Sequence, residues 1–191
     1  MYHKIPLARQ AKLWKGNATY MTLLIFSDSH GRTSKILQAL EAQPSRPDAI
    51  VFLGDGLRDM AYCELDGIPL YAVCGNCDFY SLYGTVRGED EIITDIGGKR
   101  VMMTHGNDYG VKSGLGAIVA AAVRKDVDIV LFGHTHEPLE KFIPEGNSEY
   151  GITLKKPLYL FNPGSIGGYE ASFGVLSIDR NGRVILSHGQ A

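Results

Sequence analysis

The chain lacks the features that mark secreted, membrane-spanning or nucleic-acid-binding proteins. It has three cysteines among 191 residues, and an odd number argues against a secreted disulfide framework. No apolar run approaches the ~18 residues of a membrane span, and the first twenty residues contain no continuous apolar stretch typical of a signal peptide. The formal net charge is −2, which argues against a broad nucleic-acid footprint. We therefore expect a cytoplasmic protein with no membrane partner and no strong nucleic-acid signal.

Internal repeats and low-complexity linkers are also absent, and the length indicates a single domain. Regular alternation of apolar and polar segments begins at Thr22. We expect residues 1–21 to form an N-terminal extension and residues 22–191 to form the domain. The sequence leaves three alternatives for the extension: a flexible tail, a helix packed on the body, or the product of an upstream start codon.

Glycine is abundant, with 23 residues, and many of these glycines lie in six short motifs. The motifs are DSHG at 28–31, GDG at 54–56, GNCD at 75–78, THG at 104–106, GHTH at 133–136 and NPGS at 162–165. The first five each follow an apolar, strand-like run and carry Asp, Asn or His. Because strand ends in an α/β fold meet at one rim, where ligands bind, we expect these side chains to converge.

Seven metal-binding side chains are thus expected on this rim: Asp28, His30, Asp55, Asn76, His105, His134 and His136. Carboxylates combined with imidazoles suit Mn, Fe or Zn better than Ca. A lone Asp-x-His is usually a turn and a lone His is usually a packed or surface residue, so no single motif is specific. The ordered set is specific, and it predicts a site for two metal ions.

The first half of the chain predicts a βαβαβ arrangement with parallel strands and right-handed crossovers. We expect strands at 22–27, 49–53 and 70–74, with helices at 33–42 and 57–66. Gly97-Gly98 predicts a hairpin between 91–96 and 99–104, followed by a helix at 113–125 and a strand at 128–132. The last third favours antiparallel strands at 139–143, 157–162, 172–179 and 183–188. Two mixed sheets with helices outside would accommodate these elements.

The order DxH, GD, GN, H, GHxH resembles the calcineurin-like metallophosphoesterase superfamily, and the variants GNCD and NPGS resemble its small prokaryotic branch, the YfcE-like phosphodiesterases. The resemblance covers about residues 22–188. It implies an α/β fold, a four-layer αββα sandwich of two mixed sheets flanked by helices. It also implies two divalent ions, Mn first, with Fe, Zn, Ni or Mg as alternatives, and a homodimer or larger homo-oligomer.

The resemblance further assigns roles to the motif residues. Asp28, His30 and His136 would hold one ion, Asn76, His105 and His134 the other, and Asp55 would bridge them. Asp55, Asn76 and His105 would be the catalytic residues of a phosphodiesterase in which the dinuclear centre activates water. Arg32, Asn76 and Cys77 are the expected substrate-binding residues, although a solvated surface position is the simpler reading of Arg32.

Cys77 departs from the superfamily, in which many members carry a His thought to protonate the leaving group. A thiol is a poorer proton donor than an imidazolium at neutral pH. The leading expectation is a small-molecule phosphodiester as substrate, and the alternatives within enzymes are a phosphomonoesterase or a nucleotide pyrophosphatase. A different class is a non-catalytic scaffold, because a eukaryotic retromer subunit resembles this fold; the complete ligand set favours an enzyme.

Overall fold

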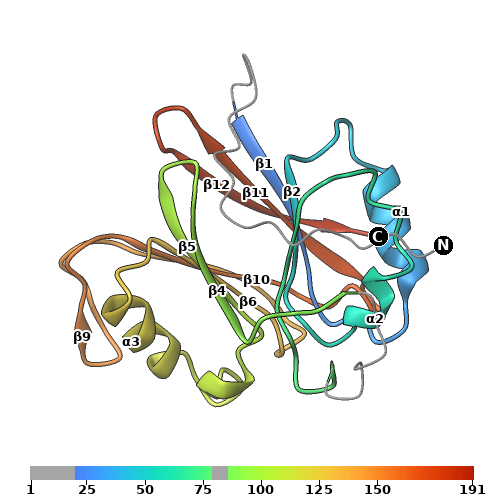
Figure 1. The fold of residues 1–191 in the computed structure, drawn as a ribbon. Helices are drawn as coiled ribbons and strands as arrows, with labels where there is room; N and C mark the ends of the chain where they lie inside the picture. Colours follow the sequence, from blue (N-terminus) through green and yellow to red (C-terminus); the bar gives the residue numbers. More distant parts are fainter. Residues whose placement is uncertain (1–19, 79–85) are drawn as a thin grey trace.

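The computed structural model describes residues 20–78 and 86–191. The chain folds into two five-stranded mixed sheets that pack face to face, with helices on the two outer faces (Figure 1). The predicted four-layer αββα sandwich is therefore confirmed. No helix in the described ranges is long and apolar enough to cross a membrane.

The first sheet has the strand order β12-β11-β1-β2-β3. Its elements are β1 (Tyr20–Phe26), β2 (Ala49–Phe52), β3 (Leu70–Ala72), β11 (Ser172–Asp179) and β12 (Val184–Gln190), with helices α1 (Thr33–Glu41) and α2 (Leu57–Met60) between the parallel strands. β1, β2 and β3 run parallel, whereas β11 and β12 pair antiparallel. β1 begins two residues earlier than predicted, and α2 is a single turn that ends at Met60 rather than at residue 66.

The second sheet has the strand order β4-β5-β6-β10-β7. Its strands are β4 (Glu91–Ile96), β5 (Lys99–Thr104), β6 (Ile129–Phe132), β7 (Pro138–Ile143) and β10 (Leu158–Pro163), and helix α3 (Gly116–Arg124) covers its outer face. The β4–β5 hairpin turns at Gly97-Gly98 as predicted. A 3-10 turn, η2 (Asn107–Tyr109), follows β5.

The last third of the chain is not antiparallel throughout, which corrects the prediction. β10 pairs antiparallel with β7 but parallel with β6. A small two-stranded sheet, β8 (Ser148–Glu149) with β9 (Ile152–Thr153), was also not predicted. Both differences depend on which strand lies beside which, and an apolar pattern within one strand carries no information on its neighbours.

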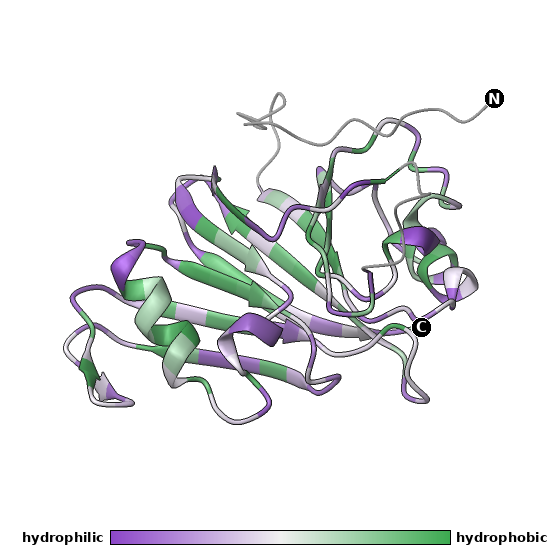
Figure 2. Ribbon diagram, turned by 60° about the horizontal axis from the view of Figure 1, so that its bottom comes forward, coloured by the Kyte–Doolittle hydropathy of each residue, from purple (hydrophilic) through white to green (hydrophobic). Residues whose placement is uncertain are grey.

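Apolar residues occur along the strands of both sheets (Figure 2), and the buried ones form three apolar clusters. In β1, Leu23 and Ile25 face the other sheet, whereas Leu24 and Phe26 pack under α1 and α2. In β6, Ile129 faces the first sheet, and the alternate residues pack under α3. Strands buried on both faces read as continuous apolar runs, which explains the runs that precede the motifs. The packed strands hold the loops at their carboxyl ends in fixed positions.

Candidate metal centre

The carboxyl ends of β1, β2, β5 and β6 and the segment after β3 deliver the five ligand-bearing motifs to one rim. The rim contains three groups of donor atoms, and within each group the atoms lie within 4.8 Å of one another. They are Asp28 with His30 and His136, Asp55 with His105 and His134, and His30 with Asp55 and Cys77. The structure therefore brings together all the predicted Asp and His ligands, from loops more than a hundred residues apart in the chain.

Asp28 is completely buried at the centre of the first group. Its Oδ2 accepts hydrogen bonds from the Ser27 hydroxyl and, at 3.0 Å, from the His134 backbone N–H. Its Oδ1 is buried without a hydrogen-bond donor among the described residues. The Nε2 atoms of His136, His30 and His105 lie 3.1, 3.9 and 4.0 Å from this oxygen. A buried anionic oxygen that accepts no hydrogen bond is costly, and a cation among these donors removes that cost.

Ring nitrogens converge in pairs at two places. His30 Nε2 lies 3.3 Å from His136 Nε2, and His134 Nδ1 lies 3.2 Å from His105 Nε2. His105 Nδ1 lies 2.7 Å from the Leu53 carbonyl, which can only accept, so Nδ1 carries the proton. In the neutral ring the Nε2 lone pair of His105 is then free for a metal. Fixing the tautomer through the other nitrogen is the usual arrangement for a metal-binding histidine.

Asp55 belongs to two of the three groups of donor atoms. Its Oδ1 accepts the Cys77 backbone N–H at 2.7 Å, and its Oδ2 lies 3.4 Å from His105 Nε2. Burial raises the pKa of Asp55, but hydrogen bonds from His105 and from the Cys77 backbone outweigh it and hold the pKa well below its usual value. Burial lowers the pKa of His105, but contacts with Asp55 and Asp28 outweigh that effect and raise it. Asp55 and His105 therefore favour each other's charged forms, and a metal ion on Nε2 would take the place of the His105 proton.

His134 has the opposite electrostatic setting. Burial lowers its pKa first, and the positive charges of His105 and Lys112 lower it further. A neutral imidazole is the form that binds a metal.

Backbone strain is concentrated in these loops. Among the described residues, eight non-glycine residues have positive φ, and five of them are expected ligands. These five are Asp28, His30, Asp55, His134 and His136. Left-handed backbone costs free energy in non-glycine residues and persists where surrounding structure enforces it, commonly at functional sites.

Two buried carboxylates tie the loops together, and neither was expected to do so. Asp59 accepts Ser29 Oγ at 2.5 Å and Gly31 N–H at 2.8 Å, so it joins the DSHG loop to α2. Asp78 accepts hydrogen bonds from four backbone N–H groups. These belong to Asp55, Gly56, Leu57 and Gly75, at 2.8 to 3.0 Å. The sequence shows Asp59 only as an Asp three residues after GDG. Its role becomes visible only in the tertiary fold.

The NPGS motif supports the rim. Asn162 Nδ2 donates to the Gly133 carbonyl at 2.8 Å, and Ser165 Oγ donates to the Asp28 carbonyl at 2.7 Å. Gly133 itself allows close approach, because a Cβ there would lie 1.9 Å from Ser27 Oγ and 2.9 Å from Asp28 Oδ2. His188 matches no motif; its Nε2 lies 2.8 Å from the Asn162 carbonyl.

The expected substrate-binding residues lie at the solvent side of the rim. Asn76, Cys77 and Arg32 are exposed, and Asn76 Nδ2 donates to Cys77 Sγ at 3.3 Å. Burial, followed by the charges of Asp55 and its neighbours, raises the pKa of the Cys77 thiol. Cys74 instead packs at the strand end, with its thiol 3.3 Å from the Gly88 carbonyl, and all three cysteines are free. Phe79, Tyr80 and Tyr83, considered as stacking residues, lie outside the described residues.

The αββα sandwich and a rim of carboxylates and imidazoles at its strand ends define the phosphoesterase class of metal site. The chain belongs to the calcineurin-like phosphoesterase superfamily, whose domain model matches residues 21–181. It is 25% identical to the probable metallophosphoesterase YsnB of Bacillus subtilis over 175 residues, covering 90% of this chain and 92% of that protein.

Solved structures show the same fold. YfcE, a phosphoesterase from E. coli, has a TM-score of 0.52 and 23% identity, covering 90% of this chain and 98% of that one. Vps29 of Entamoeba histolytica, solved in complex with zinc, has a TM-score of 0.63 and 21% identity, covering 89% of this chain and 99% of that one. The family supports hydrolase activity and metal dependence for this chain.

Proposed function

We propose that the chain is a phosphodiesterase with a dinuclear metal centre. One ion would be held by Asp28, His30 and His136. The other would be held by Asn76, His105 and His134. Asp55 would bridge the ions, and its position in two of the three donor groups is the observation that carries the proposal.

Two ions bound there would act as Lewis acids on a phosphoryl group and on water. The chain's own residues prepare the site for them. Ser27 and the His134 backbone N–H orient Asp28 so that Oδ1 faces the imidazoles. The Cys77 backbone N–H holds Oδ1 of Asp55, and the Leu53 carbonyl holds His105 in one tautomer. Asp55, Asn76 and His105 thus act as the catalytic residues by fixing the reacting geometry.

Phosphate recognition falls to groups at the solvent side of this rim. Arg32, Asn76 and Cys77 are the proposed substrate-binding residues, and all three are exposed. A cationic or amide donor beside the ions stabilises charge that develops on the phosphoryl oxygens.

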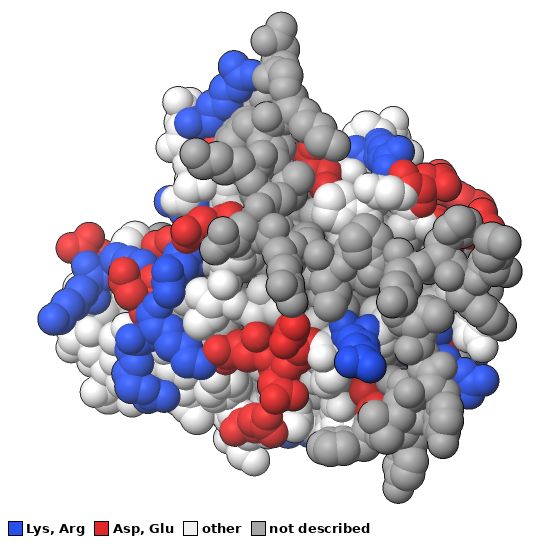
Figure 3. All heavy atoms as spheres, viewed as in Figure 1, with Lys and Arg blue, Asp and Glu red and all other residues white. Residues whose placement is uncertain are grey.

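Manganese is the proposed metal, with Fe, Zn, Ni or Mg as alternatives. Mixed carboxylate and imidazole ligands are compatible with several of these ions. The zinc complex of Vps29 supports zinc as the first alternative. We further propose a small-molecule phosphoester as substrate, a cytoplasmic location, and a homodimer or larger homo-oligomer. In the described surface in view in Figure 3, basic side chains gather at the left and acidic side chains lie beside them and at the lower centre, so no basic face extends across this view.

Two alternative functions are compatible with the same site. A phosphomonoesterase or nucleotide pyrophosphatase would use the same ligands and differ only in the loops around the rim. A scaffold role is favoured by the likeness to Vps29, which is a likeness of fold alone. The convergence of six Asp and His donors, including a buried Asp28 that lacks a hydrogen-bond donor on Oδ1, favours the enzyme.

Hydrolysis by metal-depleted and Mn-reloaded protein tests the proposal. We expect bis(p-nitrophenyl) phosphate to be cleaved after reloading, with a higher kcat/KM than p-nitrophenyl phosphate. A higher value for the monoester would favour the monoesterase. Absence of turnover on monoesters, diesters and nucleotide pyrophosphates with every one of the five metals would favour the scaffold.

A further inference from the structure

A cavity of about 750 Å³ lies at the end of the first sheet opposite to the metal rim. Its walls are the end of α1 with residues 43–47, which lead into β2, and residues 62–68, which lead towards β3. These segments precede the parallel strands, at their amino ends, whereas the candidate metal-binding motifs follow the strands, at their carboxyl ends. The cavity is therefore separate from the candidate centre, and its volume falls within the range of binding sites. We call it the α1 groove.

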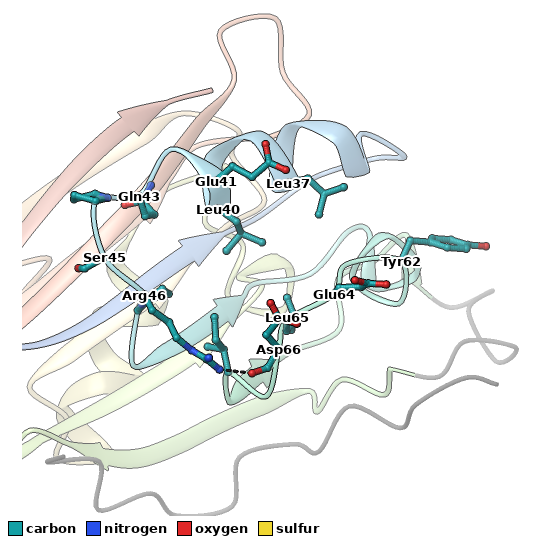
Figure 4. Close-up of a pocket in the computed structure, with 13 residues that line it drawn as sticks. Leu37, Leu40, Glu41, Gln43, Ser45, Arg46, Tyr62, Glu64, Leu65 and Asp66 are labelled. Carbon is teal, nitrogen blue, oxygen red and sulfur yellow. Dashed lines mark hydrogen bonds between the residues drawn. The ribbon is translucent and has the colours of Figure 1, made fainter.

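The floor of the α1 groove is apolar. Leu37 and Leu40 of α1 point across the groove towards the turn that carries Leu65 (Figure 4). Leu37, Leu40 and Ile68 are only half-buried, so their apolar surface stays in contact with water. Tyr62, at one end, is 59% exposed. Covering such surface contributes roughly 25 cal/mol per Å² of apolar area.

The rim of the α1 groove is acidic. Glu41, Glu64 and Asp66 are exposed, and none of the three carboxylates pairs with a cation among the described residues. Arg46 is the one basic residue in the lining, and its guanidinium donates to the backbone carbonyl of Asp66. Such a groove fits a segment that combines apolar anchors with several positive charges and no negative ones.

The start of β1 lies beside this groove. Thr22 N–H donates to the Asp48 carboxylate at 2.8 Å, and Asp48 N–H donates to the Thr22 carbonyl at 2.8 Å. Pro47, which directly precedes Asp48, lines the groove. A segment that precedes β1 in the chain is therefore tethered close to the groove.

That segment, residues 1–19, has the complementary sequence. It contains four basic residues and no Asp or Glu, and its large apolar residues include the only Trp of the chain. The basic residues are Lys4, Arg9, Lys12 and Lys15, and the apolar ones are Ile5, Leu7, Leu13 and Trp14. Trp14 is six residues from Tyr20, a span of up to ~20 Å in extended chain. A short tether supplies millimolar effective concentration, so individually weak contacts suffice.

We propose that the α1 groove binds the chain's own basic N-terminal segment, with Trp14 on the apolar floor and Lys12 and Lys15 at the acidic rim. The contact is intramolecular and lies away from the metal rim. Catalysis is therefore unaffected when the segment is released.

Because Trp14 is the only Trp, its fluorescence reports on the segment in the full-length protein. We expect Trp14 emission to be blue-shifted relative to the urea-denatured chain and several-fold less accessible to acrylamide. The double variant Glu41→Lys/Glu64→Lys should raise acrylamide quenching towards the denatured value. The matched double variant Asp95→Lys/Glu145→Lys, at exposed acids elsewhere, should leave quenching unchanged. Equal, denatured-like quenching in all three native proteins would overturn the proposal, as would a groove variant that stays protected.

A zero-length carbodiimide cross-link identifies whose segment is bound. Equal amounts of ¹⁵N-labelled and unlabelled full-length chains are mixed and cross-linked, and links from Lys12 or Lys15 to Glu41 or Glu64 are read by mass spectrometry. Links within chains of one label support the proposal. Mixed-label links at the statistical ratio would assign the groove to a second copy, and absence of these links would leave the groove without this occupant; either result overturns it.

Discussion

At the residue scale, the site depends on carboxylates whose two oxygens have different roles. Asp28 has one oxygen held by Ser27 and His134 and one oxygen left without a donor. Asp55 has one oxygen on the Cys77 backbone and the other facing His105. In both cases the protein fixes the carboxylate and leaves an oxygen for the ligand it is built to bind.

Replacing Asp55 with Ala should remove nearly all hydrolytic activity. Both proposed metal positions lose a ligand. Because metal ions stabilise the charged transition state by several kcal/mol, we expect kcat/KM to fall by about 10³-fold or more. Asp108→Ala, at an exposed acid near the rim, is the control and should retain activity. Near wild-type turnover in Asp55→Ala, at full metal occupancy, would show that Asp55 does not bridge.

Cys77 should limit the departure of basic leaving groups. General acid catalysis is worth ~10²–10⁴-fold, and a thiol with a raised pKa supplies little of it at neutral pH. We therefore expect aryl diesters to be favoured over alkyl diesters, and Cys77→His to narrow that gap. The measurement is kcat/KM for both ester types in wild type and variant at equal metal content. An unchanged ratio would mean that another group supplies the proton.

At the scale of elements, the structure consists of loops cross-linked by a few buried polar groups. Asp78, in the loop after β3, accepts three backbone N–H groups from the segment after β2 and one from Gly75 in its own loop. Asp59 joins α2 to the loop after β1. Asn162, near the end of β10, contacts the loop after β6, and Ser165, in the loop after β10, contacts the loop after β1. The rim is thus a connected set of loops rather than a row of independent ones.

Asp78→Ala should destabilise the fold as well as the site. Each buried N–H left without an acceptor costs about 1–3 kcal/mol, so we expect the free energy of unfolding in urea to fall by several kcal/mol. Asp108→Ala again provides the comparison, with a change within about 0.5 kcal/mol. Equal stability of the two variants would mean that water replaces the carboxylate without loss.

Gly133→Ala should damage the centre through contact alone. The added Cβ would lie 1.9 Å from Ser27 Oγ and 2.9 Å from Asp28 Oδ2. Overpacking of this kind costs about 1–3 kcal/mol, and displacement of Asp28 should weaken metal binding. Ser27→Ala in the same chain removes the closest atom and should restore part of the stability. Wild-type metal affinity and stability in Gly133→Ala would contradict this account of the close approach.

The sequence predicted the elements that depend on local patterns. Apolar runs located β1, β2, β3, β5 and β6, and the Gly97-Gly98 turn predicted the β4–β5 hairpin. The parallel pairing of β10 with β6, the short α2, and the roles of Asp59 and Asp78 were missed. Those features depend on contacts between segments that are distant in the chain, and such contacts cannot be deduced from local patterns in a single sequence. The convergence of the motif Asp and His side chains was predictable because each motif carries its side chain at a strand end.

At the scale of the whole molecule, the two ends of the first sheet have different tasks. The carboxyl ends of its parallel strands carry loops of the candidate metal centre, where ligands bind in open α/β sheets. The opposite end carries the α1 groove and the start of β1. Residues 1–20 contain no motif, so a chain that starts at Met21 should remain active; loss of activity in the folded, shortened protein would place the N-terminal segment in the site.

The central claim is that this fold holds two metal ions between Asp28, Asp55 and their imidazole partners. Elemental analysis of Mn-reconstituted protein, after removal of free metal, tests it most directly. The account predicts a value that approaches two ions per chain, falling below one in Asp55→Ala, with hydrolysis of bis(p-nitrophenyl) phosphate rising in parallel with occupancy. Protein that binds no ion from excess Mn, Fe, Zn, Ni or Mg would contradict it.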